Sequence, residues 1–227
     1  SEGLFMIRIA IDGPAGSGKS TTAKNVASRL KINYIDTGAM YRACAYYMLE
    51  KGVDISNESD VSGELKNMNM TVNYIGGAQH ILVNGNDVTG KLRTNEISSA
   101  ASKVAVIGSV REYLVALQRK TASLFDVIMD GRDVGTCVLK DAPVKFYLTA
   151  TVKCRAQRRY KELKEKGISC DVKEIEEQIA ARDKNDMTRE ISPLKQADDA
   201  ILIDNTALSE KQVEDIIISK VKEVYAY

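Results

Sequence analysis

Short runs of hydrophobic residues alternate along the chain with longer segments in which hydrophobic residues recur every three or four positions. The short runs contain few polar residues, as expected of strands that are covered on both faces of a sheet, and the longer segments have the period of amphipathic helices. The expected strands are residues 6–12, 32–36, 127–130, 144–149 and 200–204, and the expected helices are residues 19–30, 39–51, 96–106, 110–123, 152–166, 172–186 and 209–225. This alternation predicts an α/β fold with a doubly wound parallel sheet of about five strands.

One segment departs from the alternation. Residues 71–75 and 80–83 are short runs joined through Gly76-Gly77-Ala78, and residues 84–87 (NGND) supply a second turn signal. Such a pattern predicts an antiparallel hairpin or a small meander. We therefore expect residues 60–91 to form an inserted antiparallel lobe on the substrate-facing side of the core. The alternative is a surface hairpin that contributes nothing to the site.

The composition restricts the partners. The chain of 227 residues has 32 Lys and Arg residues against 31 Asp and Glu residues, for a formal net charge of +1, which provides no extended positive field for a nucleic acid. Its 28% charged and 44% hydrophobic residues are typical of an ordinary water-soluble domain. No hydrophobic run approaches the ~18–20 residues that span a bilayer. We expect no nucleic acid and no membrane as a partner, and a length sufficient for one core with an appended lobe.

Cysteine and histidine usage points to the cytoplasm and away from zinc. The four cysteines are scattered without a C-x-x-C pair, and no secretory signal precedes the first expected strand, so reduced thiols in the cytoplasm are expected. His80 is the only histidine, which excludes an imidazole-rich zinc site, and we expect it on an exposed strand or loop. Residues 1–5 precede Met6 and are interpreted as an addition outside the fold.

A glycine-rich segment between the first expected strand and helix predicts a phosphate-binding loop. It matches G-x-x-x-x-G-K-[ST]. The glycines let backbone N–H groups point inward, the helix N-terminus adds partial positive charge, and Lys19 supplies a cation for the β- and γ-phosphates. Ser20 offers a hydroxyl where such loops ligate Mg²⁺. The expected ATP-binding residues are Gly13, Pro14, Ala15, Gly16, Ser17, Gly18, Lys19, Ser20 and Thr21. The alternative is a glycine-rich turn with a solvated lysine.

Arginines near strand ends favour a kinase whose acceptor is itself a phosphate. The chain has no N-K-x-D run, which disfavours a GTPase. Phosphoryl transfer between two anions requires several converging cations. Residues beyond the carboxyl ends of parallel strands line the ligand crevice, so we expect Asp36, Thr37, Arg42, Arg132 and Asp133 to face one cleft with the loop. Each arginine taken alone is equally compatible with a solvated surface charge.

Asp130 ends the third expected strand, where a carboxylate near the water shell of the metal is plausible; a capped strand end is the alternative. Arg155, Arg158 and Arg159 are spaced to share one face of a helix and are candidates for a lid that closes over the triphosphate. The alternative there is a basic, solvated helix face.

Residues Arg182, Asp186 and Arg189 repeat the helical spacing and give a face that suits ribose hydroxyls and a base edge. An ordinary ion pair between residues four apart is equally compatible with this spacing.

Several segments taken together resemble the bacterial cytidylate kinase family over essentially residues 7–225. They are IAIDGPAGSGKST, YIDTGAMYR, VTGKLRTNEIS, AASKVA, MDGRDVGT, DAPVKFYL and ISPLKQADDAILIDNT. The resemblance implies the reaction ATP + CMP (or dCMP) ⇌ ADP + CDP (or dCDP), with Mg²⁺ as cofactor. It further implies a monomer with a single P-loop kinase domain over residues 1–227, a nucleoside-monophosphate lobe over about residues 37–110, and a lid over residues 153–170.

The resemblance also implies residue roles, position by position. The residues expected around cytosine are Thr37, Arg111, Asp133 and Arg189, those expected on the pentose are Ser102, Arg182 and Asp186, and those expected on the acceptor phosphate are Arg42 and Arg132. The expected catalytic cations are Lys19, Arg132, Arg155 and Arg159. Asp133 is the favoured acceptor for the 4-amino group of cytosine, because the 4-oxo group of uracil would meet its carboxylate oxygen.

Two other functions are compatible with the sequence. One is a related P-loop kinase that phosphorylates UMP or another small molecule, although clustered arginines favour a phosphate acceptor over a neutral hydroxyl. The other is a nucleotide-binding regulatory module without catalysis, which would need no acceptor pocket and whose ATP turnover would not respond to nucleoside monophosphates.

Overall fold

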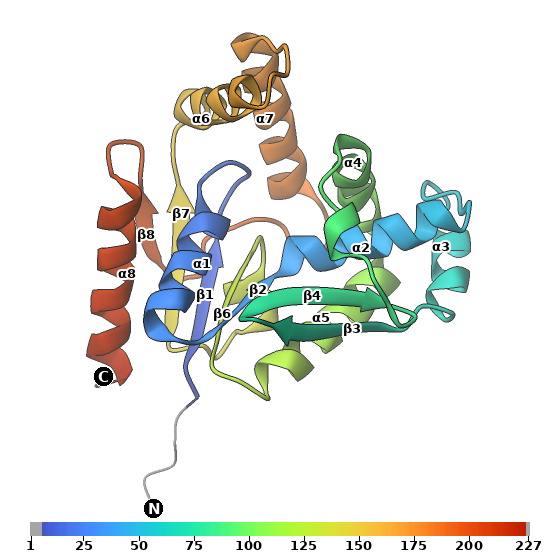
Figure 1. The fold of residues 1–227 in the computed structure, drawn as a ribbon, viewed down its shortest axis with the longest axis horizontal. Coiled ribbons are helices and arrows are strands. Elements are labelled where there is room, and N and C mark those ends of the chain that lie inside the picture. The colour runs from blue at the N-terminus through green and yellow to red at the C-terminus, as the bar shows by residue number, and fades with distance from the viewer. Residues whose placement is uncertain (1–5, 226–227) are drawn as a thin grey trace, which may run out of the picture. The chain divides into compact units, whose positions relative to one another are not determined.

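The computed structural model describes residues 6–225, and the interpretation of residues 1–5 as an addition lies outside them. The chain divides into two compact units (Figure 1). The first unit combines Ser1–Ile32 with Ile128–Tyr227, and the second unit is Asn33–Val127. Among the described residues, every helix is too short or too polar to cross a lipid bilayer.

The first unit contains most of the parallel sheet. Its elements are β1 (Arg8–Asp12), α1 (Lys19–Leu30), β6 (Val127–Gly131), a π-helical turn (Val134–Val138), β7 (Val144–Thr149), α6 (Val152–Glu165), α7 (Val172–Thr188), β8 (Ile201–Asp204) and α8 (Glu210–Tyr225). These strands follow the order β6-β1-β7-β8, and β1–β7 and β7–β8 pair in parallel, with Ile9 opposite Val144 and Phe146 opposite Ile201.

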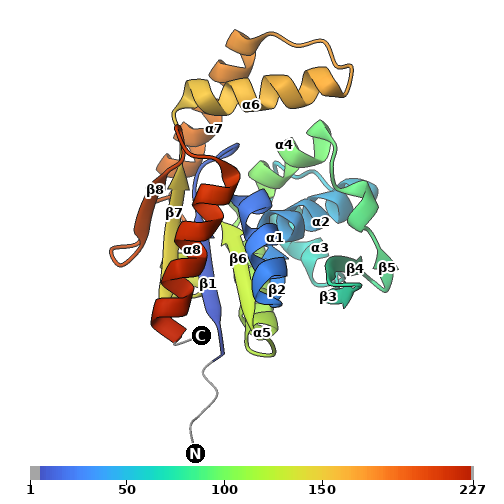
Figure 2. The ribbon, with the colours of Figure 1, turned by 60° about the vertical axis from the view of Figure 1, so that its left-hand side comes forward.

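Burial explains why the central strands are hydrophobic at consecutive positions. Ile9, Ala10 and Ile11 of β1 have no exposed surface, and Phe146 and Leu148 of β7 are equally buried. A strand covered on both faces loses the alternation of an exposed strand. Helices α1 and α8 contact each other beside these strands, as Figure 2 shows.

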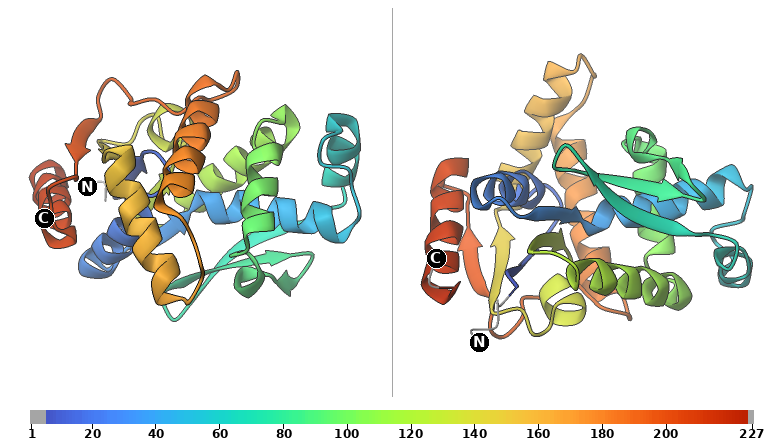
Figure 3. Two further views of the ribbon diagram at one scale, coloured as in Figure 1. Left: turned by 90° about the horizontal axis from the view of Figure 1, so that it is seen from above. Right: turned by 60° about the horizontal axis from the view of Figure 1, so that its bottom comes forward.

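The second unit carries the inserted sheet. Its elements are β2 (Asn33–Asp36), α2 (Thr37–Glu50), α3 (Glu58–Leu65), β3 (Met70–Ile75), β4 (Ala78–Val83), β5 (Asn86–Asp87), a 3-10 turn (Thr89–Lys91), α4 (Asn95–Val104) and α5 (Gly108–Ala122). The strands β3, β4 and β5 form an antiparallel sheet, visible in both views of Figure 3. Gly76 and Gly77 make the β3–β4 turn at φ 58° and 78°, values that favour glycine.

The strands and helices expected from the hydrophobic pattern are all present, and their ends differ from the predicted ones by at most two residues. One boundary was wrong, because residues 60–65 of the expected antiparallel lobe belong to helix α3. Only Val61 and Leu65 of this helix are buried, and its start is fixed by Asn57, whose side chain accepts from the N–H groups of Ser59 and Asp60. Two buried residues give too weak a period to reveal a helix. His80 lies on a strand, β4, as expected, but it is half-buried and not exposed, and it is paired with Asp87.

Candidate active site

Glycines of the loop between β1 and α1 have positive φ angles, at Gly13, Gly16 and Gly18. Gly18 precedes α1 at φ 84°, in the left-handed region. A Cβ at Gly13 would lie 2.0 Å from the carbonyl oxygen of Leu148, so that no side chain fits there. Ser17 is buried, and its carbonyl accepts from Asn205 at 2.8 Å. Thr21, on the first turn of α1, is exposed.

Lys19 is buried at the start of α1. Its Nζ donates to the carbonyl oxygen of Pro14 at 3.0 Å, which holds the ammonium group across the loop. Burial, followed by the nearby positive charge of Arg132, lowers the pKa of Lys19 to about 7. A cation destabilised in this way gains from any anion that enters the loop.

Ser20 and Asp130, each predicted separately to lie near a metal ion, form a hydrogen bond. The Ser20 hydroxyl donates to Oδ2 of Asp130 at 2.8 Å, and Asp130 is buried at the end of β6. Hydroxyl and carboxylate oxygens are ligands that Mg²⁺ prefers. Within residues 6–225 no group of three or more His, Cys, Asp or Glu side chains could hold a metal by itself. A Mg²⁺ ion at this pair would therefore take its remaining ligands from nucleotide phosphates and water, as is usual for this metal.

Asp12 is a functional candidate that sequence reasoning missed. It ends β1, is buried, and accepts from the N–H groups of Val134 and Gly135 at 2.8 and 2.7 Å. Burial raises the pKa of Asp12 to about 6. Its two bonds fix the π-helical turn that directly follows Asp133, which is itself buried. The available signal was a carboxylate at the end of a buried strand, the same signal that singled out Asp130.

Arg132 and Asp186 form an ion pair, with 2.9 Å between Nε and Oδ2. Both side chains are more than four-fifths buried. Arg182 is exposed on α7, yet its charge, like that of Arg132, lowers the pKa of Lys19. The structure therefore brings together four predicted residues of the first unit, namely Lys19, Arg132, Arg182 and Asp186.

Arg189 lies at the C-terminal end of α7, the helix that carries Arg182 and Asp186. Its Nε donates to the carbonyl oxygen of Ser192 at 2.8 Å, which ties the end of the helix to the segment that follows it.

The three arginines of α6 that were predicted to belong to a lid have separate environments. Arg155 is buried, pairs with Asp183 of α7, and donates to the carbonyl oxygen of Ala15 in the loop. Arg158 donates to the side chain and the backbone of Asn205, the residue that holds Ser17. Sequence reasoning missed Asp183 and Asn205, because nothing in their local patterns reveals a partner 28 or 47 residues away.

Arg159 is 41% exposed and pairs with Glu162 of its own helix. Arg155 thus contacts the loop, and Arg158 contacts Asn205, which is bonded to the loop. Arg159 instead pairs with Glu162 on α6 itself. The helices α6 and α7 pack on each other through a small core of Ala156, Ile175 and Ile179 (Figure 3).

In the second unit, the predicted acceptor residues cluster around the start of α2. Thr37 is its buried first residue, and Arg42 Nη2 donates to Asp36 Oδ2 at 2.9 Å. Arg111, buried on the first turn of α5, donates to the carbonyl oxygen of Ala105 and lies 5.4 Å from the ring centroid of Tyr41. Ser102 differs from these, because it is exposed on α4 and bonds only weakly, at 3.4 Å, to the carbonyl oxygen of Ser98.

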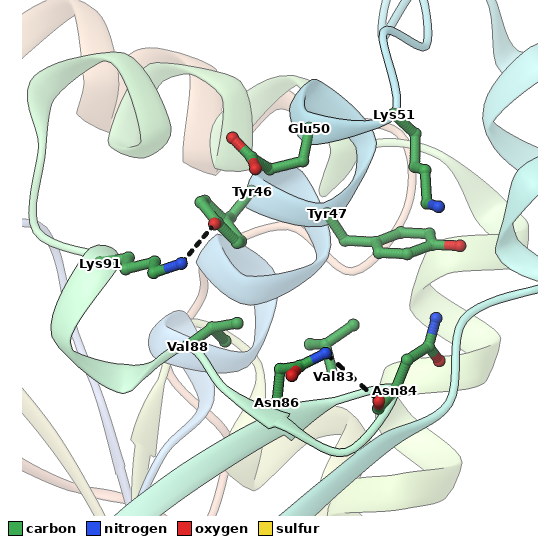
Figure 4. Close-up of a pocket in the computed structure, with 9 residues that line it drawn as sticks. All are labelled: Tyr46, Tyr47, Glu50, Lys51, Val83, Asn84, Asn86, Val88 and Lys91. Atoms are coloured by element: carbon green, nitrogen blue, oxygen red, sulfur yellow. Dashed lines mark hydrogen bonds between the residues drawn. The ribbon is translucent and has the colours of Figure 1, made fainter.

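A hollow of about 420 Å³ also lies in the second unit, away from these side chains. Figure 4 shows Tyr46 and Tyr47 of α2 above it and the β4–β5 turn below it, with the ammonium of Lys91 bonded to the hydroxyl of Tyr46 at 3.1 Å. Its lining residues are Tyr46, Tyr47, Glu50, Lys51, Val83, Asn84, Asn86, Val88 and Lys91. None of the predicted ligands belongs to this set, so the hollow is not the predicted site.

Comparisons of the chain with family models and with curated proteins point to the same family. The sequence model of the cytidylate kinase family matches residues 9–223. A cytidylate kinase of Alkaliphilus oremlandii is 49% identical over 97% of this chain and 100% of the relative, and one of Lactobacillus johnsonii is 46% identical over 97% and 94%. A solved structure of an uncharacterized protein from Eubacterium ventriosum is 14% identical over 96% of this chain and 99% of that chain, with a TM-score of 0.52, and this likeness concerns the fold alone.

Proposed function

The chain belongs to the cytidylate kinase family and is a nucleoside monophosphate kinase, and we propose that it transfers the γ-phosphoryl group of ATP to CMP and dCMP, giving ADP with CDP or dCDP. The observation that carries the proposal is the loop itself. It holds a buried Lys19 beside the Ser20–Asp130 pair, with Arg132 close enough to lower the pKa of Lys19. Under this proposal, the loop that would hold the donor phosphates and the arginine that would bind the acceptor phosphate belong to the same unit.

The donor phosphates would lie on residues 13–21. Their backbone N–H groups and the Lys19 ammonium neutralise the β- and γ-phosphates. Mg²⁺ would be held by Ser20, with Asp130 acting through a water molecule, and when bound it offsets the negative charge of the phosphates. The residues present fit such an ion, since the available ligands are hard oxygen atoms.

The acceptor phosphate would be bound by Arg42 and Arg132. Asp36 pairs with Arg42 and Asp186 pairs with Arg132, and each pair keeps its guanidinium in one orientation. The remaining N–H groups of each guanidinium can then donate to two oxygens of the phosphate. Asp186 would then serve two groups, Arg132 and a pentose hydroxyl, which agrees with its capacity to accept several hydrogen bonds.

The remaining ligands would read the nucleoside. Cytosine would be surrounded by Thr37, Arg111, Asp133 and Arg189, and the pentose by Ser102, Arg182 and Asp186. We assign the 4-amino group to Asp133, because a buried carboxylate accepts from an amine and repels a 4-oxo group. That difference is the proposed basis for CMP over UMP.

Catalysis in this scheme consists of positioning and charge neutralisation. The acceptor phosphate already carries an ionised oxygen, so no protein nucleophile or general base is required. Lys19, Arg132, Arg155 and Arg159 are the proposed cations, the last two from a lid over residues 153–170. We further propose a monomer that acts in the cytoplasm, with the nucleoside-monophosphate lobe at about residues 37–110.

The decisive experiment measures ADP formation from ATP and Mg²⁺ with CMP, dCMP, UMP, AMP and GMP supplied in turn. High turnover with CMP and dCMP and low turnover with the others is expected. Lys19→Met should lower turnover by about a hundredfold or more, as expected on losing one preorganised charge. Equal turnover with UMP and CMP would overturn the cytosine assignment. An ATP turnover that does not increase when any nucleoside monophosphate is added would favour the regulatory module.

A further inference from the structure

Two side chains of the β3–β4 hairpin reach the backbone of β2. Tyr74 and Gln79 are direct cross-strand partners, and such partners point to the same face of a sheet. The Tyr74 hydroxyl donates to the carbonyl oxygen of Tyr34 at 3.3 Å, and Oε1 of Gln79 accepts from the N–H of Asp36 at 2.8 Å. The hairpin therefore holds β2 at two points that lie two residues apart.

The Tyr74 anchor is itself fixed. Its ring meets the ring of Phe125 edge to face, with 5.9 Å between centroids and 74° between planes. Burial raises the pKa of the Tyr74 hydroxyl, so this group is a neutral donor at any physiological pH. A ring held in this way cannot swing away from β2 without losing the aromatic contact.

Asp36 connects the hairpin to Arg42 through hydrogen bonds of its backbone and its carboxylate. While its N–H donates to Gln79, its carboxylate accepts from the N–H of Ala39 at 2.8 Å and from Nη2 of Arg42 at 2.9 Å. A Cβ at Gly38 would lie 3.2 Å from Asp36 Oδ1 and 3.3 Å from Arg42 Nη1, so these groups are closely packed. A shift of the Asp36 backbone would move the carboxylate and the guanidinium together.

Two donors beside this chain of contacts have no partner within residues 6–225. They are Nε of Arg42 and Nε2 of Gln79, both without solvent contact. Leaving a buried donor unpaired costs free energy. Gln79 nevertheless accepts a hydrogen bond from the Asp36 N–H through Oε1 while its Nε2 stays unpaired. This indicates that the bond to the Asp36 backbone determines the orientation of the Gln79 side chain.

We propose that Gln79 is a positioning residue for the acceptor phosphate, with Tyr74 as the second anchor of the same device. The hairpin fixes the end of β2, β2 fixes Asp36, and Asp36 sets the plane of the Arg42 guanidinium. This inference rests on the proposed function, in which Arg42 binds the phosphate of CMP. It gives the inserted sheet a role in binding the acceptor.

The test replaces Gln79 by Met, which has a similar length but no acceptor. Asn73→Met is the matched control, since Asn73 is exposed and lies next to Tyr74 on the opposite face of the same hairpin. We expect the KM for CMP to rise roughly two- to tenfold, the range for losing one hydrogen bond, while kcat and the KM for ATP stay within twofold. Binding of cytidine, which has no phosphate, should change less than binding of CMP.

A double-mutant cycle with Arg42→Ala locates the effect. In the Arg42→Ala background, Gln79→Met should raise the KM for CMP by less than twofold, because the group that it positions is gone. Equal rises of the KM values for CMP and ATP, or a full additional rise without Arg42, would overturn the inference.

Failure of the inference is separable from failure of the proposed function. If the unaltered protein does not phosphorylate CMP, the proposed function is wrong. If it does, and Gln79→Met leaves the KM for CMP unchanged, only the positioning role is wrong. Should Gln79→Met fail to fold, Tyr74→Phe decides, because it retains the ring and removes only the hydroxyl. An unchanged KM for CMP in that variant would overturn the inference.

Discussion

Arg155 and Asp183 join helices α6 and α7 by a paired contact, with 3.0 Å from Nη1 to Oδ1 and 2.6 Å from Nη2 to Oδ2. Nη1 of the same guanidinium donates to the carbonyl oxygen of Ala15 at 2.9 Å. One side chain thus links α6, α7 and the phosphate loop. Both side chains are almost completely buried, so the contact belongs to the interior of the first unit.

Removing the charge of Asp183 should destabilise the protein. Asp183→Asn leaves the Arg155 guanidinium buried without a counter-charge, and we expect the free energy of unfolding to fall by about 3 kcal/mol. Urea unfolding measures the change. Glu162→Gln is the control, since Glu162 is the half-exposed partner of Arg159, and it should cost less than about 1 kcal/mol. Equal losses in the two variants would contradict the importance of the buried pair.

ATP binding should take up protons above neutral pH. The pKa of Lys19 is lowered to about 7, so above pH 7 the side chain of the free protein is mostly neutral. Bound phosphates favour the ammonium form and raise this pKa again, so binding takes up as much as one proton. Affinity should therefore fall as the pH rises from 7 to 9, by up to about tenfold per pH unit.

Isothermal titration calorimetry in buffers of different ionisation enthalpy measures this proton uptake. Lys19→Met should abolish most of it, whereas Lys24→Met, an exposed lysine of the same helix, should leave it in place. Uptake that persists in the Lys19 variant would show that another group titrates.

The pKa of Lys19 also affects stability. Because the folded-state pKa lies below the ordinary value of 10.5, the contribution of Lys19 to stability is fully present above pH 10.5 and is lost as the pH falls through 7. In Lys19→Met this dependence should disappear, which urea unfolding at pH 6.5 and 9 would detect after comparison with the Lys24→Met control.

Two glycines should respond to alanine in opposite directions. At Gly13 the new Cβ would overlap the carbonyl oxygen of Leu148, so Gly13→Ala should lower stability by at least about 2 kcal/mol. At Gly63, in the middle of α3, nothing lies within 4 Å of the new Cβ, and Gly63→Ala should raise stability by roughly 0.5–1 kcal/mol through helix propensity. Thermal unfolding of both variants checks the pair, and a destabilising Gly63→Ala would contradict the assignment of α3.

Ser20→Ala should weaken the use of Mg²⁺. The variant removes the hydroxyl that bonds Asp130 and, under the proposed function, ligates the metal. We expect the Mg²⁺ concentration for half-maximal activity to rise by about tenfold, comparable to other losses of ligand support at metal sites. Ser28→Ala, an exposed position further along α1, should have no effect. An unchanged Mg²⁺ requirement in Ser20→Ala would place the metal elsewhere.

Local patterns were sufficient for most elements of the fold. The hydrophobic runs of β1 and β7 are buried on both faces, and their short length together with their composition distinguishes them from helices. The glycine-rich motif locates the loop before α1 without reference to the rest of the chain. Helix α3 was missed because only Val61 and Leu65 are buried on it. An element of this length depends on its cap and its surroundings more than on a pattern.

The functional residues that the sequence did not reveal were missed for a different reason than helix α3. Asp12 meets N–H groups more than 120 residues away, and Gln79 meets Asp36 across 43 residues. Such partners are created by the tertiary fold, and a single sequence gives no local signal for them. The predicted arginines and the carboxylates Asp36 and Asp186 could be located by charge and spacing, but not Asp183, the partner of Arg155.

The geometry of Arg155 limits what this residue can do. A guanidinium has five N–H bonds, and four of them are committed, one to Ala150, one to Ala15 and two to Asp183. A single bond remains, too few for a two-pronged grip on a phosphate. To bind an anion through two N–H groups, Arg155 would have to give up a hydrogen bond to Ala150, Ala15 or Asp183, so anion binding at this side chain would come at the expense of a contact inside the first unit.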